Sequence, residues 1–193
     1  MTESVFRAKA PKLMSRLMEE FGFSVEDAAA IAGNAGHESA GFTKLQEIKP
    51  TVPGSRGGYG WFQWTGPRRK AFEKFSLEMK LHPASDAANI AFLIHELKTT
   101  ERAAIKKTKE AKTFNDKVVA FEEAFERAGA KHYASRWRWA YIALDAYKEG
   151  AAPIPAPPDI PGPEPAPPVT DAPKGGLLAL IINLILAIFK RKG

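Results

Sequence analysis

Apolar residues recur at helical spacing in successive stretches of the first 150 residues, and each stretch is bounded by Gly, Pro, Ser or Asn. This periodicity, with breaker residues at both ends, predicts amphipathic helices. The first starts near Pro11, because proline suits the first turn of a helix, and it stops at Gly22. Its apolar face carries Leu13, Met14, Leu17 and Met18. The remaining helices are expected at about 25–40, 65–80, 85–98, 101–111, 115–128 and 131–148.

The helix over 25–40 is rich in Ala and Gly, so a neighbouring backbone can approach it closely. We therefore expect it to be the central buried helix of the domain. It opens at Ser24, and Asp27 stands three residues later, which is the spacing of a capping box. Gly41 closes it. The later helix over 65–80 has Thr65 in the N-cap region and Pro67 in the first turn.

Residues 42–64 break the helical pattern. Pro and Gly punctuate short segments there, which predicts an irregular lobe or a small β-hairpin sheet forming one wall of a cleft. The expected fold is therefore α+β and mainly α, with two lobes, and this domain covers residues 1–150. The breakers are Pro50, Pro53, Gly57, Gly58 and Gly60.

Residues 151–173 hold ten of the fifteen prolines and predict an extended linker rather than a core element. In polyproline conformation it would reach about 70 Å.

Residues 174–193 form a hydrophobic and basic C-terminal segment. The apolar run Leu177–Phe189 would be roughly 20 Å long as a helix, which is short of the roughly 30 Å core of a bilayer. It either docks on the core of the domain or inserts into a membrane while Lys190, Arg191 and Lys192 reach the headgroups. The proline-rich spacer favours the membrane.

The composition limits the possible partners. With 193 residues, 45% of them apolar, the chain can bury one core of ordinary size. A net charge of +6 and a pI near 9.5 indicate an anionic partner: nucleic acid, a membrane surface or an acidic wall polymer. The basic residues are dispersed and no nucleic-acid motif occurs, so we expect no nucleic-acid partner. We also expect a monomer.

Several features are missing from the sequence. The chain has no cysteine, which excludes disulfides and thiolate metal sites, and its histidines show no metal-ligand spacing. We expect neither a metal nor another cofactor. The N-terminus carries charges every few residues and does not resemble a secretory signal, so we expect another device to move the protein out of the cytoplasm.

Glu38, in the last turn of the central helix, is the candidate for a catalytic acid, that is, a side chain that donates a proton in the reaction. The helix dipole opposes negative charge there, and Phe42 and Trp61 are expected as apolar neighbours. Both effects disfavour ionisation. An acid that keeps its proton near neutral pH can protonate a leaving glycosidic oxygen, as glycoside hydrolysis requires.

Two further residues are catalytic candidates. Glu47 is the only other carboxylate between Glu38 and Glu73, so it is either the base or charge stabiliser of a two-carboxylate mechanism or an acid on the lobe surface. Thr65 either orients a water or caps the helix that follows it.

Aromatic and amide side chains around residue 60 are candidates for sugar binding. If 59–64 is a strand, Trp61 and Gln63 share one face while Phe62 and Trp64 share the other, so at least one set belongs to the core. Arg68 either meets carboxylates of the cleft wall or covers a helix face. The candidates for substrate binding are Tyr59, Trp61, Gln63, Trp64 and Arg68.

The last predicted helix carries Arg136, Trp137, Arg138 and Trp139 in succession. At helical spacing, Trp139 packs into the core with Ile142 and Ala143, and the arginines line the cleft or face solvent. His37 is more consistent with a structural than a catalytic role, because neighbours on a helix point about 100° apart.

Three segments carry a family likeness: GNAGHESAGF, GYGWFQWTGPRR and FEEAFERAGAKHYASRWRWA. Over about residues 10–148 the chain resembles the phage-tail-lysozyme type of domain and, more widely, the lysozyme-like superfamily of phage endolysins and lytic transglycosylases. The resemblance implies a two-lobed, mainly helical fold that cuts the β-1,4 bond between N-acetylmuramic acid and N-acetylglucosamine in peptidoglycan. Glu38 matches the catalytic acid of the family. The spacing to Glu47 is similar to that of phage lysozymes, which usually carry Asp there.

The expected function is a phage endolysin with muramidase activity that causes host cell lysis. It would be made in the host cytoplasm and act in the periplasm after release through a holin lesion. Its C-terminal segment resembles the basic, apolar termini with which phage endolysins of Gram-negative hosts engage membranes. The alternatives are a lytic transglycosylase, a chitin-cleaving relative, and a non-catalytic wall-binding virion or membrane protein.

Overall fold

The computed structural model describes residues 2–50, 52 and 54–151. The chain divides into two units, Met1–Pro153 and Ile154–Gly193, and the described residues belong to the first. The linker was expected over 151–173; Ala151 is instead the last residue of α7, and the rest of the expected linker and the expected C-terminal helix lie outside the described residues.

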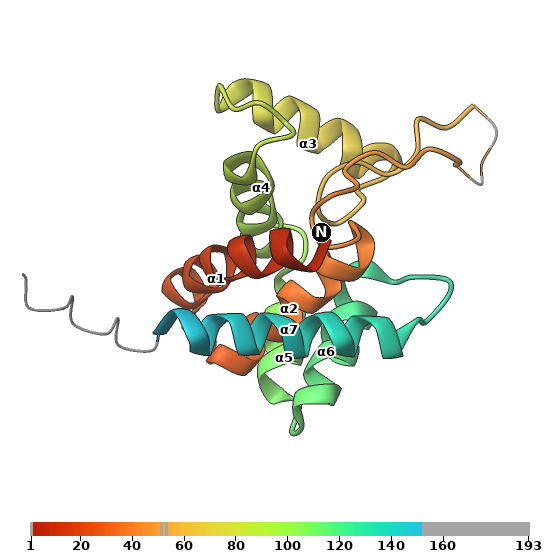
Figure 1. Ribbon diagram of the computed structural model, residues 1–193. Helices are drawn as coiled ribbons and strands as arrows, with labels where there is room; N and C mark the ends of the chain where they lie inside the picture. The colour runs from red at the N-terminus through yellow and green to blue at the C-terminus, as the bar shows by residue number, and fades with distance from the viewer. Residues whose placement is uncertain (1, 51, 53, 152–193) are drawn as a thin grey trace, which may run out of the picture. The chain divides into compact units, whose positions relative to one another are not determined.

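The described part of the chain is mainly helical, as the sequence predicts (Figure 1). Every expected helix is present, with ends that differ by a few residues in most cases. The elements are α1 Thr2–Phe21, α2 Val25–Glu38, α3 Gly66–Glu78, α4 Asp86–Lys98, α5 Arg102–Glu110, α6 Phe114–Phe121, the π-helical turn η1 Glu122–Glu126, and α7 Tyr133–Ala151.

The central helix of the domain is α2, as expected. It packs against α1, α6 and α7. Its glycines permit this packing, since a Cβ on Gly33 would lie 2.5 Å from the Cβ of Ala140, and one on Gly36 would lie 2.7 Å from the ring of Phe6. At its N-terminus Ser24 and Asp27 form the complete capping box that their spacing predicts.

The first helix is longer than predicted. It starts at Thr2, and Pro11 lies inside it rather than in its first turn. Phe6 and Ala10 extend the apolar stripe of the helix N-terminal to the proline, and both are fully buried. Burial of this stripe against α2 and α7 outweighs the hydrogen bond that the proline removes. The helix therefore has about two and a half more turns than a start at the proline would give it.

The segment between α2 and α3 is a compact loop rather than the expected hairpin sheet. Within its described residues it has only two isolated antiparallel bridges, Gln46 with Tyr59 and Tyr59 with Trp64. Gly60 and Gln63 both have positive φ, 83° and 45°, so the chain turns where a strand would continue. In Figure 1 this loop lies beside α3, and its Phe62 ring packs on Phe121 of α6, with the ring centroids 6.2 Å apart.

The helix expected over 115–128 ends early. It is α-helical only to Phe121 and continues as η1, which closes at Arg127 in the left-handed conformation, with φ 53°. A sequence period near 3.6 cannot distinguish an α turn from a π turn. Among the described residues, no helix is long and apolar enough to cross a membrane.

Candidate active site

Glu38 is the last residue of α2, and the chain reverses directly after it. Ser39 Oγ donates to the carbonyl of Ala35, at 2.6 Å, and accepts from the backbone N–H of Phe42, at 2.9 Å. The Gly41 N–H donates to the carbonyl of Gly36, at 2.8 Å. These bonds fix the end of the helix, so the Glu38 carboxylate has a defined position.

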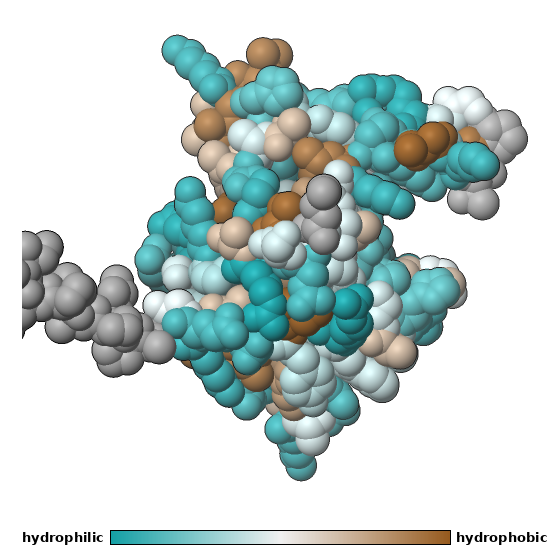
Figure 2. All heavy atoms as spheres, in the orientation of Figure 1, coloured by the Kyte–Doolittle hydropathy of each residue, from teal (hydrophilic) through white to brown (hydrophobic). Residues whose placement is uncertain are grey.

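The end of α2 lies near an indentation of the surface. Figure 2 shows this indentation on the side where, in Figure 1, the loop before α3 overhangs the loop between η1 and α7. The Glu38 side chain is 20% exposed, so it is not closed off from solvent.

The partner of Glu38 is Arg136, from the first turns of α7. Arg136 Nη2 donates to Glu38 Oε1 at 2.6 Å, and the arginine side chain is only 1% exposed. Its Nη1 donates to Asn34 Oδ1 at 2.8 Å, and Asn34 in turn donates to the carbonyls of Ala30 and Val118. A guanidinium therefore contacts the candidate acid, where an apolar neighbour was expected.

The expectation that the arginines line the cleft or face solvent is confirmed for one of the two. Arg138 is 62% exposed and pairs with Glu3 on the surface, whereas Arg136 is 1% exposed and buried against Glu38. Trp139, Ile142 and Ala143 are buried in the core, as predicted.

Arg68, in α3, meets a carboxylate of the neighbouring helix α4. Its Nε and Nη2 donate to the two oxygens of Glu96, each at 2.8 Å, and Trp64 Nε1 donates to the same carboxylate at 2.7 Å. Arg68 Nη1 also reaches the carbonyl of Phe125, at 3.3 Å, and its Cζ lies 4.5 Å from the centre of the Phe125 ring. The network ties α3 and α4 to η1.

Trp61 and Trp64 are core residues of the lobe, which corrects the expectation that their rings face sugars. Each is 1% exposed. The Trp61 ring stacks on Phe42 at 4.0 Å, and the Trp64 ring packs on Phe72 at 4.5 Å. The expected separation into two faces also fails, because the segment turns at Gly60 and is not a strand.

Gln63 and Tyr59 stabilise the loop from within. Gln63 Nε2 donates to the carbonyls of Lys44, Leu45 and Gly60, at 2.9–3.2 Å. The half-buried ring of Tyr59 lies 5.0 Å from the guanidinium carbon of Arg69. The amide nitrogen of Gln63 is therefore occupied by backbone carbonyls.

Glu47 belongs to the same internal framework. Its Oε2 accepts from the backbone N–H of Gly58 at 2.8 Å, and its own N–H donates to the carbonyl of Gly58 at 2.9 Å. Within the described part of the chain, neither a hydrogen bond nor an ion pair joins Glu47 to Glu38. Thr65 is exposed at the N-cap of α3, and its side chain makes no capping bond.

His37 Nδ1 lies 2.9 Å from Ser135 Oγ, and its ring centroid lies 5.6 Å from that of His132. Burial, followed by the positive charges of Arg136 and His132, lowers the pKa of His37 to about 4. His37 is therefore neutral at physiological pH. The described residues contain no group of three or more His, Cys, Asp or Glu able to hold a metal.

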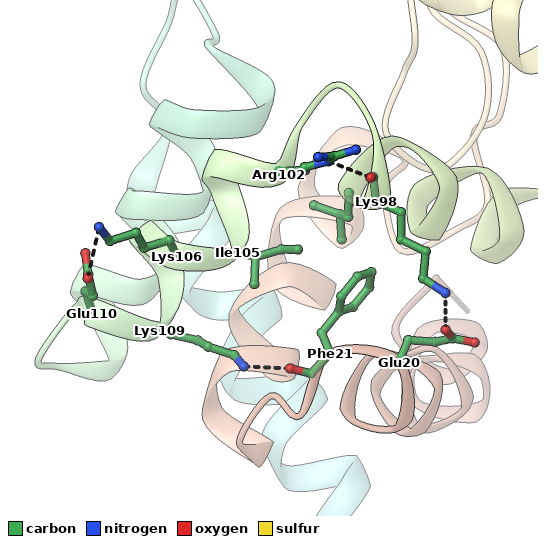
Figure 3. A pocket seen from close by; sticks show the side chains of 9 residues that line it. Glu20, Phe21, Lys98, Arg102, Ile105, Lys106, Lys109 and Glu110 are labelled. Atoms are coloured by element: carbon green, nitrogen blue, oxygen red, sulfur yellow. Dashed lines mark hydrogen bonds and ion pairs between the residues drawn. The ribbon is translucent and has the colours of Figure 1, made fainter.

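Two pockets of the described domain bear on the candidate residues, and neither is lined by Glu38. A pocket of about 650 Å³ between the end of α1, α4 and α5 contains none of the predicted site residues (Figure 3). Two of its cations are engaged internally, as Lys98 pairs with Glu20 and Lys109 donates to the carbonyl of Phe21. A smaller pocket, of about 230 Å³, is lined by Arg68 and Glu96.

Sequence reasoning missed the role of Arg136 and passed over Glu126, the last residue of η1. A signal for Arg136 was present: it shares a helical stripe with Ala140 and Ala143, both fully buried. An arginine within an apolar stripe must be paired with a carboxylate. The sequence signal for Glu126 is weaker. Glu122 and Glu126 each follow a phenylalanine that is fully buried, so both glutamates start close to the core.

A mainly helical domain with a partly exposed glutamate at the end of its central helix is the arrangement of a lysozyme-like enzyme. The profile of one family, described as phage tail lysozyme, matches residues 8–147. The chain belongs to this family, and it is therefore a peptidoglycan-degrading enzyme of phage type. Comparison with curated proteins gives no match, and neither does comparison with solved structures.

Proposed function

We propose that the chain is a muramidase, which hydrolyses the β-1,4 bond between N-acetylmuramic acid and N-acetylglucosamine. The observation that carries this proposal is the position of Glu38: its carboxylate is held by the buried Arg136 at 2.6 Å, and its side chain is still 20% exposed. An acid catalyst needs such a fixed position within reach of a glycosidic oxygen.

In this mechanism Glu38 gives a proton to the leaving oxygen as the bond from that oxygen to the sugar C1 breaks. Positive charge develops on the ring, and Glu47, from the loop that overhangs the site, stabilises it or activates the water that attacks C1. The water adds its oxygen to C1 and returns its proton to a carboxylate. No metal or cofactor is required.

One observation favours a lytic transglycosylase instead. The Glu47 carboxylate already accepts from the Gly58 N–H, so it belongs to the framework of the loop. In a transglycosylase Glu38 alone acts as acid and then as base, and the C6 hydroxyl of the sugar attacks C1. No second carboxylate is needed.

Product analysis distinguishes the two reactions. Purified peptidoglycan is digested with the full chain, and the fragments are analysed by mass spectrometry. Muramidase activity leaves reducing N-acetylmuramic ends, which are 18 Da heavier than 1,6-anhydro ends because one water is added. Anhydro ends would overturn hydrolysis, and the absence of any cleavage would overturn catalysis altogether.

Localisation and membrane association are also proposals. We infer an endolysin role in the periplasm after holin-dependent release, with residues 174–193 engaging a bacterial membrane. The support is the apolar run ending in Lys190, Arg191 and Lys192. Deleting residues 174–193 should abolish binding to anionic liposomes and leave activity on purified peptidoglycan unchanged. Equal liposome binding by the truncated chain would overturn the membrane role.

A further inference from the structure

The end of α4 and the whole of α5 form a basic stretch that contains none of the candidate site residues. The fifteen residues from Lys98 to Lys112 include six cations and two acids, which gives a net charge of +4, against +6 for the whole chain. Although basic residues occur throughout the sequence, most of the net charge therefore lies here. Such an excess raises the local concentration of ligands of the opposite charge.

The pocket of about 650 Å³ between the end of α1, α4 and α5 lies on this stretch. Its volume is within the range of about 300–1,000 Å³ that is typical of ligand sites. Figure 3 shows the Phe21 ring and the Ile105 side chain pointing toward the middle of the pocket. Leu97 also lines it and is fully buried. The pocket therefore has an apolar floor.

Two of the cations that line the pocket have donors to spare. Arg102 Nε donates to the carbonyl of Lys98 at 2.7 Å, but its two Nη groups make no hydrogen bond or ion pair within the described residues. The Lys106 side chain is 77% exposed, and its ammonium lies 3.7 Å from a carboxylate oxygen of Glu110. Arg102 and Lys106 are one turn apart on α5, so both can meet the same ligand.

The other two cations are fixed in place. Lys98 pairs with Glu20 and lies 6.0 Å from the centre of the Phe21 ring, and Lys109 donates to the carbonyl of Phe21 at 2.6 Å. An ammonium has three N–H groups, so each of these lysines can still donate to a further acceptor.

The acids of the pocket do not neutralise it. Only Glu20 and Glu110 line it, against four cations, and Glu20 is also paired with Arg16. The pocket therefore complements an anionic ligand that carries small apolar groups.

Peptidoglycan, the substrate of the family, supplies such a ligand. Its sugar chains carry short stem peptides, in which alanine methyl groups stand beside free carboxylates. A lipid surface fits less well, because proteins that insert into lipid present exposed apolar side chains to it. In the described part of the chain, the large apolar side chains that are exposed all lie outside this pocket: Ile48, Val52, Leu77, Met79 and Tyr141.

We propose that this pocket is a second wall-binding site, in which Arg102 and Lys106 bind carboxylates of a stem peptide while its methyl groups pack on Phe21 and Ile105. Binding one polymer at two places makes the second contact intramolecular, so the enzyme stays longer on the wall. The inference rests on peptidoglycan being the substrate, as in the proposed function, but not on how the glycosidic bond is broken.

The first test measures binding to the insoluble wall. Purified peptidoglycan is sedimented with the full chain carrying Glu38→Gln, which suppresses digestion. Adding Arg102→Gln and Lys106→Gln should weaken binding about three- to tenfold at low salt, since each exposed charge contact is weak by itself. The difference should vanish near 1 M salt, where the Debye length is about 3 Å. Unchanged binding at low salt would overturn the inference.

The matched control is the pair of changes Lys70→Gln and Lys74→Gln, made in the same Glu38→Gln chain. These lysines are exposed and one turn apart on α3, as Arg102 and Lys106 are on α5. Lys74 is 76% exposed and lies 3.7 Å from a carboxylate four residues later, which matches Lys106 closely. The control should bind the wall as its parent does. Equal losses in the two double variants would show that net charge alone is responsible, which would also overturn the inference.

The second test uses a soluble probe and does not depend on activity. Stem peptides released from purified peptidoglycan by an amidase are added to the isotope-labelled full chain, and its backbone amides are followed by NMR. We expect saturable shifts at Phe21 and over 97–110, and none once the carboxylates of the peptide have been converted to amides. The absence of shifts there, or equal shifts with the amidated peptide, would refute the site.

Liposomes separate a wall site from a lipid site. Arg102→Gln with Lys106→Gln should leave binding to anionic liposomes unchanged. Loss of liposome binding with wall binding intact would identify a lipid site and overturn the inference. If the wild type failed to cleave peptidoglycan while the stem peptide still bound to α5, only the proposed function would fail.

Discussion

The loop between α2 and α3 and the junction of α2, η1 and α7 differ in how completely their polar groups are paired. In the loop, the Gln63 amide nitrogen binds three carbonyls and the Glu47 carboxylate binds a backbone N–H. At the junction, Glu126 Oε1 and Arg136 Nε are both buried without partners among the described residues.

The difference shows that residue types suited to sugar binding do not by themselves locate the chemistry. The segment richest in aromatics, glycines and amides mainly holds its own fold together. The segments that appear as ordinary amphipathic helices bring the buried charges together. The predictions below test this division, in order of decreasing effect on stability.

The largest effect is expected for Arg136→Met. This change leaves Glu38 and Asn34 Oδ1 without their donor in a buried environment, and breaking such a pair costs about 3–5 kcal/mol. The free energy of unfolding, measured with urea, should fall by this amount. The control is Arg138→Met, whose exposed pair with Glu3 should contribute less than about 1 kcal/mol. Equal losses in the two variants would show that the junction is not a buried charge cluster.

Trp64→Phe tests whether the loop between α2 and α3 stabilises the fold rather than binding sugar. The change removes the hydrogen bond from Nε1 to Glu96 and should lower the free energy of unfolding by about 1–3 kcal/mol. Activity on peptidoglycan, per folded molecule, should stay within about threefold of the wild type. A loss of more than about 100-fold at unchanged stability would instead identify Trp64 as a sugar-binding residue.

His37 gives the junction a pH-dependent stability. Its pKa of about 4 lies below the ordinary value of 6.5, so between these values the unfolded chain binds a proton that the folded chain does not. The stability contributed by neutral His37 is therefore complete above pH 6.5 and is lost as the pH falls to 4. Because His37 is only partly buried, we expect the free energy of unfolding to fall by about 1–2 kcal/mol. This is less than the pKa shift of His37 would give if converted in full.

The comparison of two histidine variants checks this prediction. His37→Asn should flatten the dependence of unfolding free energy on pH between 6.5 and 4, whereas His82→Asn, at an exposed site, should retain it. If both variants retained the wild-type slope, the acid sensitivity would originate outside the junction.

The smallest effect is expected for Thr65→Ala. Thr65 occupies the N-cap of α3 without a capping hydrogen bond, so its loss should change the free energy of unfolding by less than about 0.5 kcal/mol. The matched variant is Thr113→Ala, since Thr113 caps α6 by accepting from the Asp116 N–H and should lose about 1 kcal/mol. A larger loss of unfolding free energy for Thr65→Ala than for Thr113→Ala would contradict the finding that only Thr113 of the two makes a capping hydrogen bond.

Much of the fold is predictable because its signals are local. Periodic apolar residues, the Ser24–Asp27 capping box and the Thr65–Pro67 helix start each depend on a few neighbouring residues. The position of Glu38 at the end of the central helix follows from Gly41 and from the small residues of α2. These features need no knowledge of the rest of the chain.

The features that could not be predicted depend on distant contacts. Arg136 meets Glu38 across 98 residues of sequence, and Trp64 meets Glu96 across 32. In η1, which is π-helical, Phe125 packs against Arg68 of α3. The spacing of residues along the chain does not encode this contact. The burial of Trp61 depends on the positive φ of Gly60, which turns the chain out of the strand that alternation predicts.

The most direct test of the central claim, that Glu38 is the acid at the junction, is the rate at which Glu38→Gln cleaves purified peptidoglycan. Glutamine can still accept the hydrogen bond from Arg136, so the circular dichroism spectrum and melting behaviour should show a folded protein. We predict a loss of about 10²- to 10⁴-fold in rate per folded molecule. A variant that is folded and cleaves at the wild-type rate would contradict the account.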